Sequence, residues 1–182
     1  MFYKIMIKEP VNFTRELLKK FAFTPTLKQG ELFNLLSSFI FNDNKDALFL
    51  LKGYAGTGKT TVIGSFVNTL WKANKKSVLL APTGRAAKVI SVYSKKPAFT
   101  IHKKIYFPKK NTNGLVDFVL QANKHRNTIF IVDVASMIPD GKQNQQLFDS
   151  KSLLDDLINY VSSGHADLKL CKGRGIGRFH LE

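Results

Sequence analysis

The fold of this chain follows from one stretch of its sequence, Ala47-Leu48-Phe49-Leu50-Leu51-Lys52-Gly53-Tyr54-Ala55-Gly56-Thr57-Gly58-Lys59-Thr60. It opens with an unbroken apolar run, residues 47–51, which is typical of a strand buried on both faces. Glycines follow directly after that run. Apolar residues then recur at three- and four-residue steps from Val62 to Trp71, which predicts an amphipathic helix. The order of strand, glycine-rich loop and helix indicates an α/β protein.

The rest of the chain repeats this alternation of strands and helices. Residues 77–81 and 128–132 are two more buried runs that predict strands, and the helix before the first of them implies a right-handed parallel crossover. Shorter apolar patterns predict a helix over about 85–91 and a last helix capped by Ser152. Residues 115–120 predict a strand outside the simple alternation. We therefore expect an α/β fold with a mostly parallel sheet flanked by helices.

Composition and charge restrict the class of protein. The 182 residues include 28 Lys and Arg against 13 Asp and Glu, so the net charge of +15 favours a polyanionic partner. The single cysteine, Cys171, excludes an internal disulfide, and no Cys and His spacing offers four zinc ligands. No apolar run has membrane-spanning length, so we expect no membrane partner and a cytoplasmic location.

Residues 53–60 match the Walker A pattern in full, between a predicted strand and a predicted helix. In this arrangement, backbone amides and the helix N-terminus point at the oxygens of a phosphate chain. Lys59 is expected to bridge the β- and γ-phosphates, and the Thr60 hydroxyl is expected to bind Mg²⁺. The alternative is a glycine-rich turn without a ligand. The sequence thus predicts binding of ATP and Mg²⁺ by Gly53, Gly56, Thr57, Gly58, Lys59, Thr60 and Thr61.

The strand predicted over 128–132 ends on Asp133, where a Walker B aspartate holds Mg²⁺ beside the phosphate loop. An aspartate in this place is otherwise an ordinary turn residue. The Walker A motif upstream favours the metal ligand, so Lys59 and Asp133 are the predicted catalytic residues.

Four segments in this order, 53–61, 81–87, 99–102 and 131–137, resemble the first motor domain of RecD-like DNA helicases of superfamily one. The resemblance spans roughly residues 24–161. It implies a RecA-like P-loop NTPase domain that couples ATP hydrolysis to movement along single-stranded DNA, normally from 5′ to 3′.

The resemblance also assigns roles to residues outside the phosphate loop. Gln29 matches the glutamine that binds adenine in this family, although Thr26 and Gln29 also form the pattern of a capping box at a helix start. Arg85 could equally be a solvated residue, and His102 an ordinary half-buried histidine. The residues that the resemblance assigns to DNA binding are Pro82, Thr83, Gly84, Arg85, Thr100 and His102.

Two departures from the family pattern bear on activity. Val134 stands where the family has the glutamate that orients and deprotonates the attacking water. Because a valine cannot accept a proton, we expect nucleotide binding with impaired turnover. After Val161 the family continues into a strand, a Gly-Asp-x-x-Gln-Leu-Pro-Pro segment and a second motor domain with an arginine finger, and we expect none of these here. We therefore expect a truncated or frame-shifted relative whose reading frame changes near Gly164. A partner chain could supply the second motor domain.

The expected organisation is an N-terminal segment, 1–23, a RecA-like P-loop ATP-binding domain, 24–163, and an atypical basic tail, 164–182. The tail has too few consecutive apolar residues to predict a core strand, and the sequence leaves its order open. Family membership favours an ATP-dependent DNA helicase. The alternatives are a non-hydrolysing nucleotide- and DNA-binding module, an inactive helicase remnant, and a kinase, which would need an arginine-bearing lid that the sequence does not reveal.

Overall fold

The computed structural model describes residues 6–43, 47–54, 56–110, 112–133 and 152–164, and the backbone of 169–173. Within these residues, five strands form one sheet in which every neighbouring pair is parallel. Their spatial order is β1 (Leu48–Leu51), β7 (Lys169–Gly173), β6 (Thr128–Val132), β2 (Lys76–Ala81) and β3 (Ala98–Thr100). The predicted α/β fold with a parallel sheet is confirmed.

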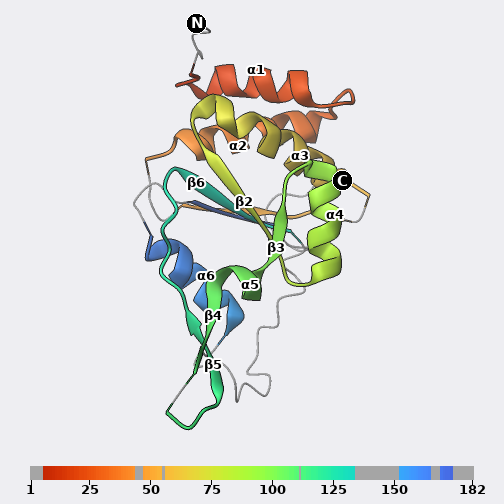
Figure 1. Ribbon diagram of the computed structural model, residues 1–182. Coiled ribbons are helices and arrows are strands. Elements are labelled where there is room, and N and C mark those ends of the chain that lie inside the picture. The colour runs from red at the N-terminus through yellow and green to blue at the C-terminus, as the bar shows by residue number, and fades with distance from the viewer. Residues whose placement is uncertain are drawn as a thin grey trace, which may run out of the picture.

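Helices cover both faces of this sheet (Figure 1). One face carries α1 (Pro10–Lys20), α2 (Leu27–Phe41), α3 (Lys59–Thr69), its short extension η1 (Leu70–Ala73) and α4 (Gly84–Ser94). The other face carries α5 (Ile101–Ile105) and α6 (Leu153–Ser162). Strand β6 shows the division directly, because Ile129 and Ile131 join the first core cluster and Phe130 and Val132 join the second.

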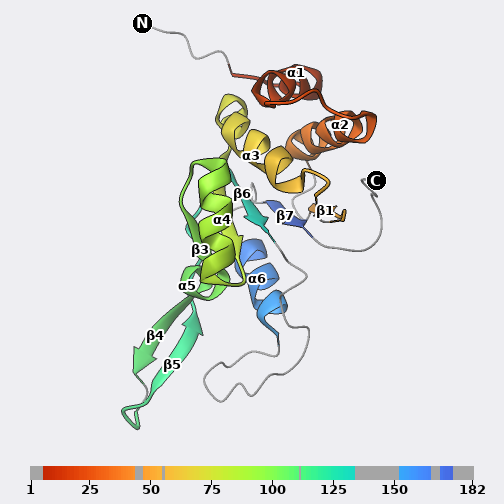
Figure 2. The same ribbon diagram turned by 90° about the vertical axis from the view of Figure 1, so that its right-hand side faces the viewer.

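A two-stranded antiparallel hairpin projects from the domain beyond α5 (Figure 2). It consists of β4 (Tyr106–Lys110) and β5 (Val116–Leu120), with Tyr106 opposite Leu120 at its base. The strand predicted over 115–120 therefore exists, and it departs from the parallel alternation because it pairs with β4 away from the main sheet.

Helix α1 lies within residues 1–23, which were predicted to be a segment separate from the domain. Phe13 and Leu17 on this helix are completely buried, and both belong to the core cluster built on α2 and α3. Phe13 packs edge-on against Phe41 and Phe66, with ring centroids 6.0 and 6.3 Å apart. The described part of the N-terminal segment thus shares one core with the nucleotide-binding region.

The expectation that no core strand lies beyond residue 164 is wrong. Strand β7 pairs with β1 on one side and with β6 on the other, at the registers Leu48↔Leu170 and Phe130↔Leu170. Without it, both neighbours would each expose a row of unpaired backbone groups in the middle of the sheet. This demand for main-chain pairing does not require a continuous apolar run. Residues 165–168 and 174–182 lie outside the described residues.

Candidate nucleotide site

The strand register brings the four sequence motifs to one edge of the sheet. Along the parallel strands, Val132 pairs with Leu80 of β2 and with Lys172 of β7, and Leu51 pairs with Gly173. On the other side, Ala81 pairs with Thr100. The residues that directly follow β1, β6, β2 and β3 therefore meet at the carboxyl edge, which is where open α/β sheets bind ligands.

The phosphate loop between β1 and α3 has a backbone shaped by two glycines. Gly56 and Gly58 have φ angles of +84° and +82°, in the left-handed region that favours glycine. Gly58 is the N-cap of α3 and offers no side chain, whereas α2, α4, α5 and α6 each begin with a hydroxyl that accepts a backbone N–H. The first N–H groups of α3 are therefore open to an anion.

Lys59 folds back over this loop. Its Nζ donates hydrogen bonds to the carbonyl oxygens of Gly53 and Tyr54, at 2.6 and 2.5 Å, and the Thr57 hydroxyl donates to the same Tyr54 oxygen at 2.9 Å. The ammonium group thus lies across the opening that phosphate oxygens would enter. The other predicted phosphate-loop residues are half-buried or exposed: Gly53, Gly56, Gly58, Thr60 and Thr61.

Gln29 connects the start of α2 to the phosphate loop. The capping box is confirmed, since Thr26 Oγ1 accepts from the Gln29 N–H at 3.3 Å and Gln29 Oε1 accepts from the Thr26 N–H at 3.0 Å. In addition, Gln29 Nε2 donates to the Thr57 carbonyl at 3.2 Å. The capping box and a position beside the nucleotide site are therefore compatible, and the adenine-binding role remains a prediction.

Asp133 follows β6 at the same edge and is half-buried. Its backbone N–H donates to the Leu80 carbonyl at 3.0 Å, which continues the pairing of β6 with β2. One strand, β7, separates β6 from β1, so Asp133 lies about 10 Å from the line of β1. Residues 134–137, including Val134, lie outside the described residues.

The residues present fit a magnesium nucleotide. The loop amides and Lys59 suit the phosphates, while the Thr60 hydroxyl and the Asp133 carboxylate are hard oxygen ligands of the kind that Mg²⁺ prefers. No group of three His, Cys, Asp or Glu side chains in the described part of the chain could hold a metal. A nucleotide-bound Mg²⁺ does not need such a group, because phosphates and water complete its coordination.

The segments assigned to DNA binding lie side by side, because β2 and β3 are paired. Thr83 and Thr100 cap α4 and α5, where their hydroxyls accept the N–H groups of Ala86 and Lys103 at 3.2 and 3.3 Å. Neither cap was predicted, although a threonine directly before a helix is the sequence signal for one. Each hydroxyl retains its own hydrogen for donation to a phosphate. Pro82 is half-buried, whereas Gly84 and Arg85 are exposed.

His102 follows Thr100 on α5 and is exposed. Its ring lies 5.9 Å from the ring of Tyr106 at an interplanar angle of 40°. Although His102 as a whole is exposed, its imidazole ring is partly desolvated, and this lowers the pKa of His102 below its usual value because a desolvated imidazolium is disfavoured. At neutral pH this side chain is therefore a hydrogen-bonding group rather than a cation.

Comparison with known proteins matches residues 38–157, about two thirds of the chain, to a family model described as an AAA domain. The chain belongs to this AAA domain family. As an AAA domain it is a nucleotide-binding P-loop NTPase, in agreement with the phosphate loop at the carboxyl edge of its sheet. Among the described helices of this AAA domain, none has the length and apolar character to cross a bilayer.

Proposed function

We propose that this AAA domain binds ATP, Mg²⁺ and single-stranded DNA as the first motor domain of a RecD-like ATP-dependent DNA helicase. The observation that carries the proposal is the shared carboxyl edge, where the uncapped start of α3 lies along the same row as the Pro82 and Thr100 segments. A nucleotide and a DNA backbone bound at one edge can influence each other through short loops.

The residues of the site have separable tasks. When a nucleotide binds, Lys59 Nζ donates its hydrogen bonds to phosphate oxygens in place of the Gly53 and Tyr54 carbonyls. The backbone amides after Gly58 donate to the same phosphate oxygens. Bound Mg²⁺ would neutralise charge that develops on the phosphates, held by Thr60 and Asp133. Gln29 lies where it can bind the base, since its amide already contacts the phosphate loop.

The proposed function includes only slow ATP hydrolysis by this chain. Val134 carries no proton acceptor, and a positioned general base contributes about 10²- to 10⁴-fold to such a step. A second candidate function follows from the same residue: a non-hydrolysing module that binds nucleotide and DNA without turnover.

Steady-state ATP hydrolysis with and without an oligothymidylate at low salt tests the proposal. We expect a low rate in the natural chain, and a DNA-stimulated increase of about 10²- to 10⁴-fold in Val134→Glu. Lys59→Ala in the Val134→Glu background is the control and should abolish both the hydrolysis and the binding of a fluorescent nucleotide.

The outcomes separate the candidates. Binding of nucleotide and DNA, with no hydrolysis even in Val134→Glu, would favour the non-hydrolysing module. Nucleotide binding without any DNA binding would overturn the helicase assignment and leave the P-loop NTPase intact.

A further inference from the structure

A second pocket lies away from the nucleotide edge, where the β4–β5 hairpin joins the domain. Its volume is about 400 Å³, large enough for a phosphate group with part of the molecule that carries it. Lys104 comes from the end of α5, Tyr160 comes from α6, and the remaining wall is the segment between β5 and β6. The lining residues are Lys104, Gln121, Ala122, Lys124, His125 and Tyr160.

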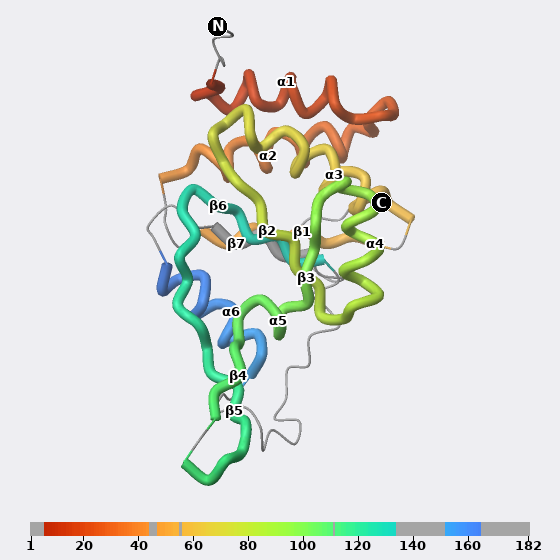
Figure 3. The backbone as a smooth tube through the Cα atoms, viewed as in Figure 1, coloured from red at the N-terminus to blue at the C-terminus, as the bar shows by residue number. Residues whose placement is uncertain are grey.

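The wall formed by residues 121–127 is irregular in backbone but firmly held. Figure 3 shows this segment running from β5 to β6 along one side of the domain. The Gln121 N–H donates to the Ile105 carbonyl at 2.8 Å, next to the last pair of the hairpin. Buried Asn123 donates from Nδ2 to the Tyr160 carbonyl at 3.0 Å, and its Oδ1 accepts the His125 N–H at 3.0 Å. The segment therefore presents its side chains in a preformed arrangement.

The pocket carries the positive charges of Lys104 and Lys124, and Lys104 Nζ also lies 5.5 Å from the centroid of the Phe99 ring, a cation–π contact. Among the described residues, no carboxylate lies within ion-pair distance of Lys104, Lys124 or His125. Asp156, one turn before Tyr160, is buried and accepts the hydroxyl hydrogen of Tyr106. Burial lowers the pKa of His125, and the charges of Lys104 and Lys76 lower it further. An anion in the pocket would relieve this repulsion.

We propose that this pocket binds a phosphate group of a nucleic-acid backbone, as a second anion site separate from the phosphate loop. Two lysines and an imidazole can each donate to phosphate oxygens. The assignment of this phosphate to a polynucleotide rests on the proposed function and on the hairpin. The hairpin extends from the pocket and carries Lys109 and Lys110, both exposed. A strand bound along the hairpin would bring further phosphates to these lysines.

The binding test measures the affinity of the full chain for oligothymidylate over a range of salt concentrations. We expect Lys124→Gln to reduce the slope of log K against log salt by about 0.7, the value for one phosphate contact on a single strand. Lys104→Gln should do the same. Lys20→Gln removes an equal charge from the exposed end of α1 and should leave the slope unchanged.

A local readout comes from the His125 imidazole resonances, which depend neither on the nucleotide site nor on the Walker motifs. Bound phosphate should raise the pKa of His125, because a nearby anion favours the imidazolium. The titration is repeated with oligothymidylate and with inorganic phosphate as separate probes, in the natural chain and in Lys59→Ala.

Each outcome decides a different point. A higher His125 pKa with the oligonucleotide, together with the smaller slopes, supports the site. An oligonucleotide that binds without moving the His125 pKa, and with equal slopes in Lys124→Gln and Lys20→Gln, overturns the site but leaves the proposed function standing. If inorganic phosphate raises the His125 pKa and the oligonucleotide does not, the pocket does not bind a nucleic-acid backbone. That result also counts against DNA binding by the domain.

Discussion

Gly58 occupies the most restrictive position found along the phosphate loop. Its φ of +82° is unfavourable for any residue with a side chain, and a Cβ built there would lie 2.9 Å from Gln29 Nε2. The same glycine leaves the first turn of α3 without a side-chain cap. A single residue thus shapes the anion site and leaves room for the Gln29 amide beside it.

We expect Gly58→Ala to weaken nucleotide binding at least tenfold and to lower the free energy of unfolding by about 1–2 kcal/mol, from left-handed backbone strain. Fluorescent-nucleotide titration and urea unfolding measure the two effects. Gly30→Ala is the matched control, since Gly30 lies in α2 with no atom within 4 Å of a built Cβ. It should keep nucleotide affinity and gain up to about 1 kcal/mol.

The double variant Gly58→Ala with Gln29→Ala separates the two causes. Removal of the Gln29 amide relieves the collision but leaves the φ angle strained, so Gly58→Ala should lower the free energy of unfolding less in the Gln29→Ala background than in the natural chain, but still lower it. Stability is the readout for this pair, because Gln29 is itself a predicted nucleotide-binding residue. Wild-type affinity in Gly58→Ala would contradict the description of the loop.

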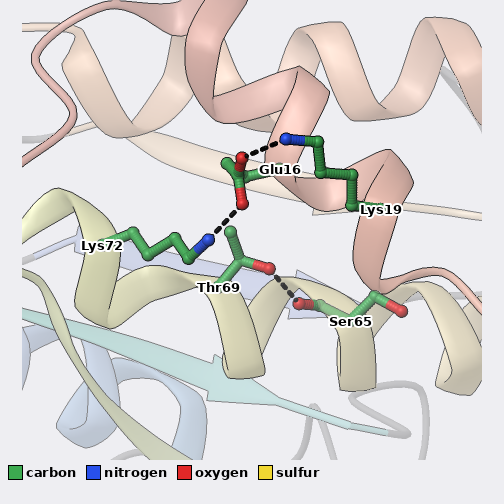
Figure 4. A network of polar contacts seen from close by, with 5 residues as sticks. All are labelled: Glu16, Lys19, Ser65, Thr69 and Lys72. Atoms are coloured by element: carbon green, nitrogen blue, oxygen red, sulfur yellow. Dashed lines mark hydrogen bonds and ion pairs between the residues drawn. The ribbon is translucent and has the colours of Figure 1, made fainter. Parts of the chain in front are cut away.

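At the scale of an element, α1 is joined to the domain by apolar packing, by a hydrogen bond of 2.8 Å from the Thr14 hydroxyl to Ser37 Oγ on α2, and by the carboxylate of Glu16. Glu16 forms ion pairs with Lys19 on its own helix and with Lys72 on η1, and Figure 4 shows both contacts beside the Thr69 to Ser65 hydrogen bond. The hydrogen bond from Lys72 is the main cause that lowers the pKa of Glu16 to about 2. The contact with Lys72 connects residues far apart in the sequence.

This shift predicts a pH dependence of stability. Because the folded-state pKa of Glu16 lies below the usual value of 4.5, its stabilisation is complete above about pH 4.5 and disappears as the pH falls toward 2. We expect Glu16→Gln to cost about 0.5–1 kcal/mol at pH 7, as for a partly exposed ion pair, and almost nothing near pH 2. Urea unfolding at several pH values checks this, with the exposed Glu31→Gln as the control. An equal loss at all pH values would contradict it.

Phe13 tests whether α1 belongs to the core. We expect Phe13→Ala to lower the free energy of unfolding by about 3–5 kcal/mol, because a buried aromatic ring between Phe41 and Phe66 is removed. Trp71, the single tryptophan, reports the unfolding by its fluorescence. Val11→Ala, on the exposed face of the same helix, should change stability by less than about 0.5 kcal/mol. Unchanged unfolding in Phe13→Ala would mean that α1 is an appendage.

At the scale of the whole molecule, the sheet depends on β7, which follows all the other described strands in the sequence. Strand β7 pairs with β1 and β6 and so connects the strand that leads into the phosphate loop to the rest of the sheet. The site geometry at the carboxyl edge therefore requires β7 in place.

Hydrogen exchange tests this position of β7. Amides within residues 169–173 should be protected to a degree comparable with those of β6, since both strands are paired on two sides. Leu170→Pro removes one donor from this central strand, and we expect it to abolish cooperative folding. Exchange of residues 169–173 at the rate of an unstructured peptide would contradict the sheet order.

Local signals in the sequence determined much of this protein. The glycines and lysine of the phosphate loop, the capping box at Thr26 and the buried run over 128–132 each act within a few residues, so their structures follow from short segments. The strand over 76–81 agrees with the predicted range of 77–81 for the same reason.

Only the tertiary structure decided the place of β7, the burial of α1 and the convergence of four motifs at one edge. Helix α1 has a buried face because α2 and α3 lie against Phe13 and Leu17, and β7 is a core strand because two open strand edges meet it. Such pairing joins main-chain groups between segments far apart in the chain, and main-chain groups are the same in every residue. Side-chain patterns therefore carry no record of the strand order, whereas helix caps, turns and apolar periodicity depend on the side chains of short segments.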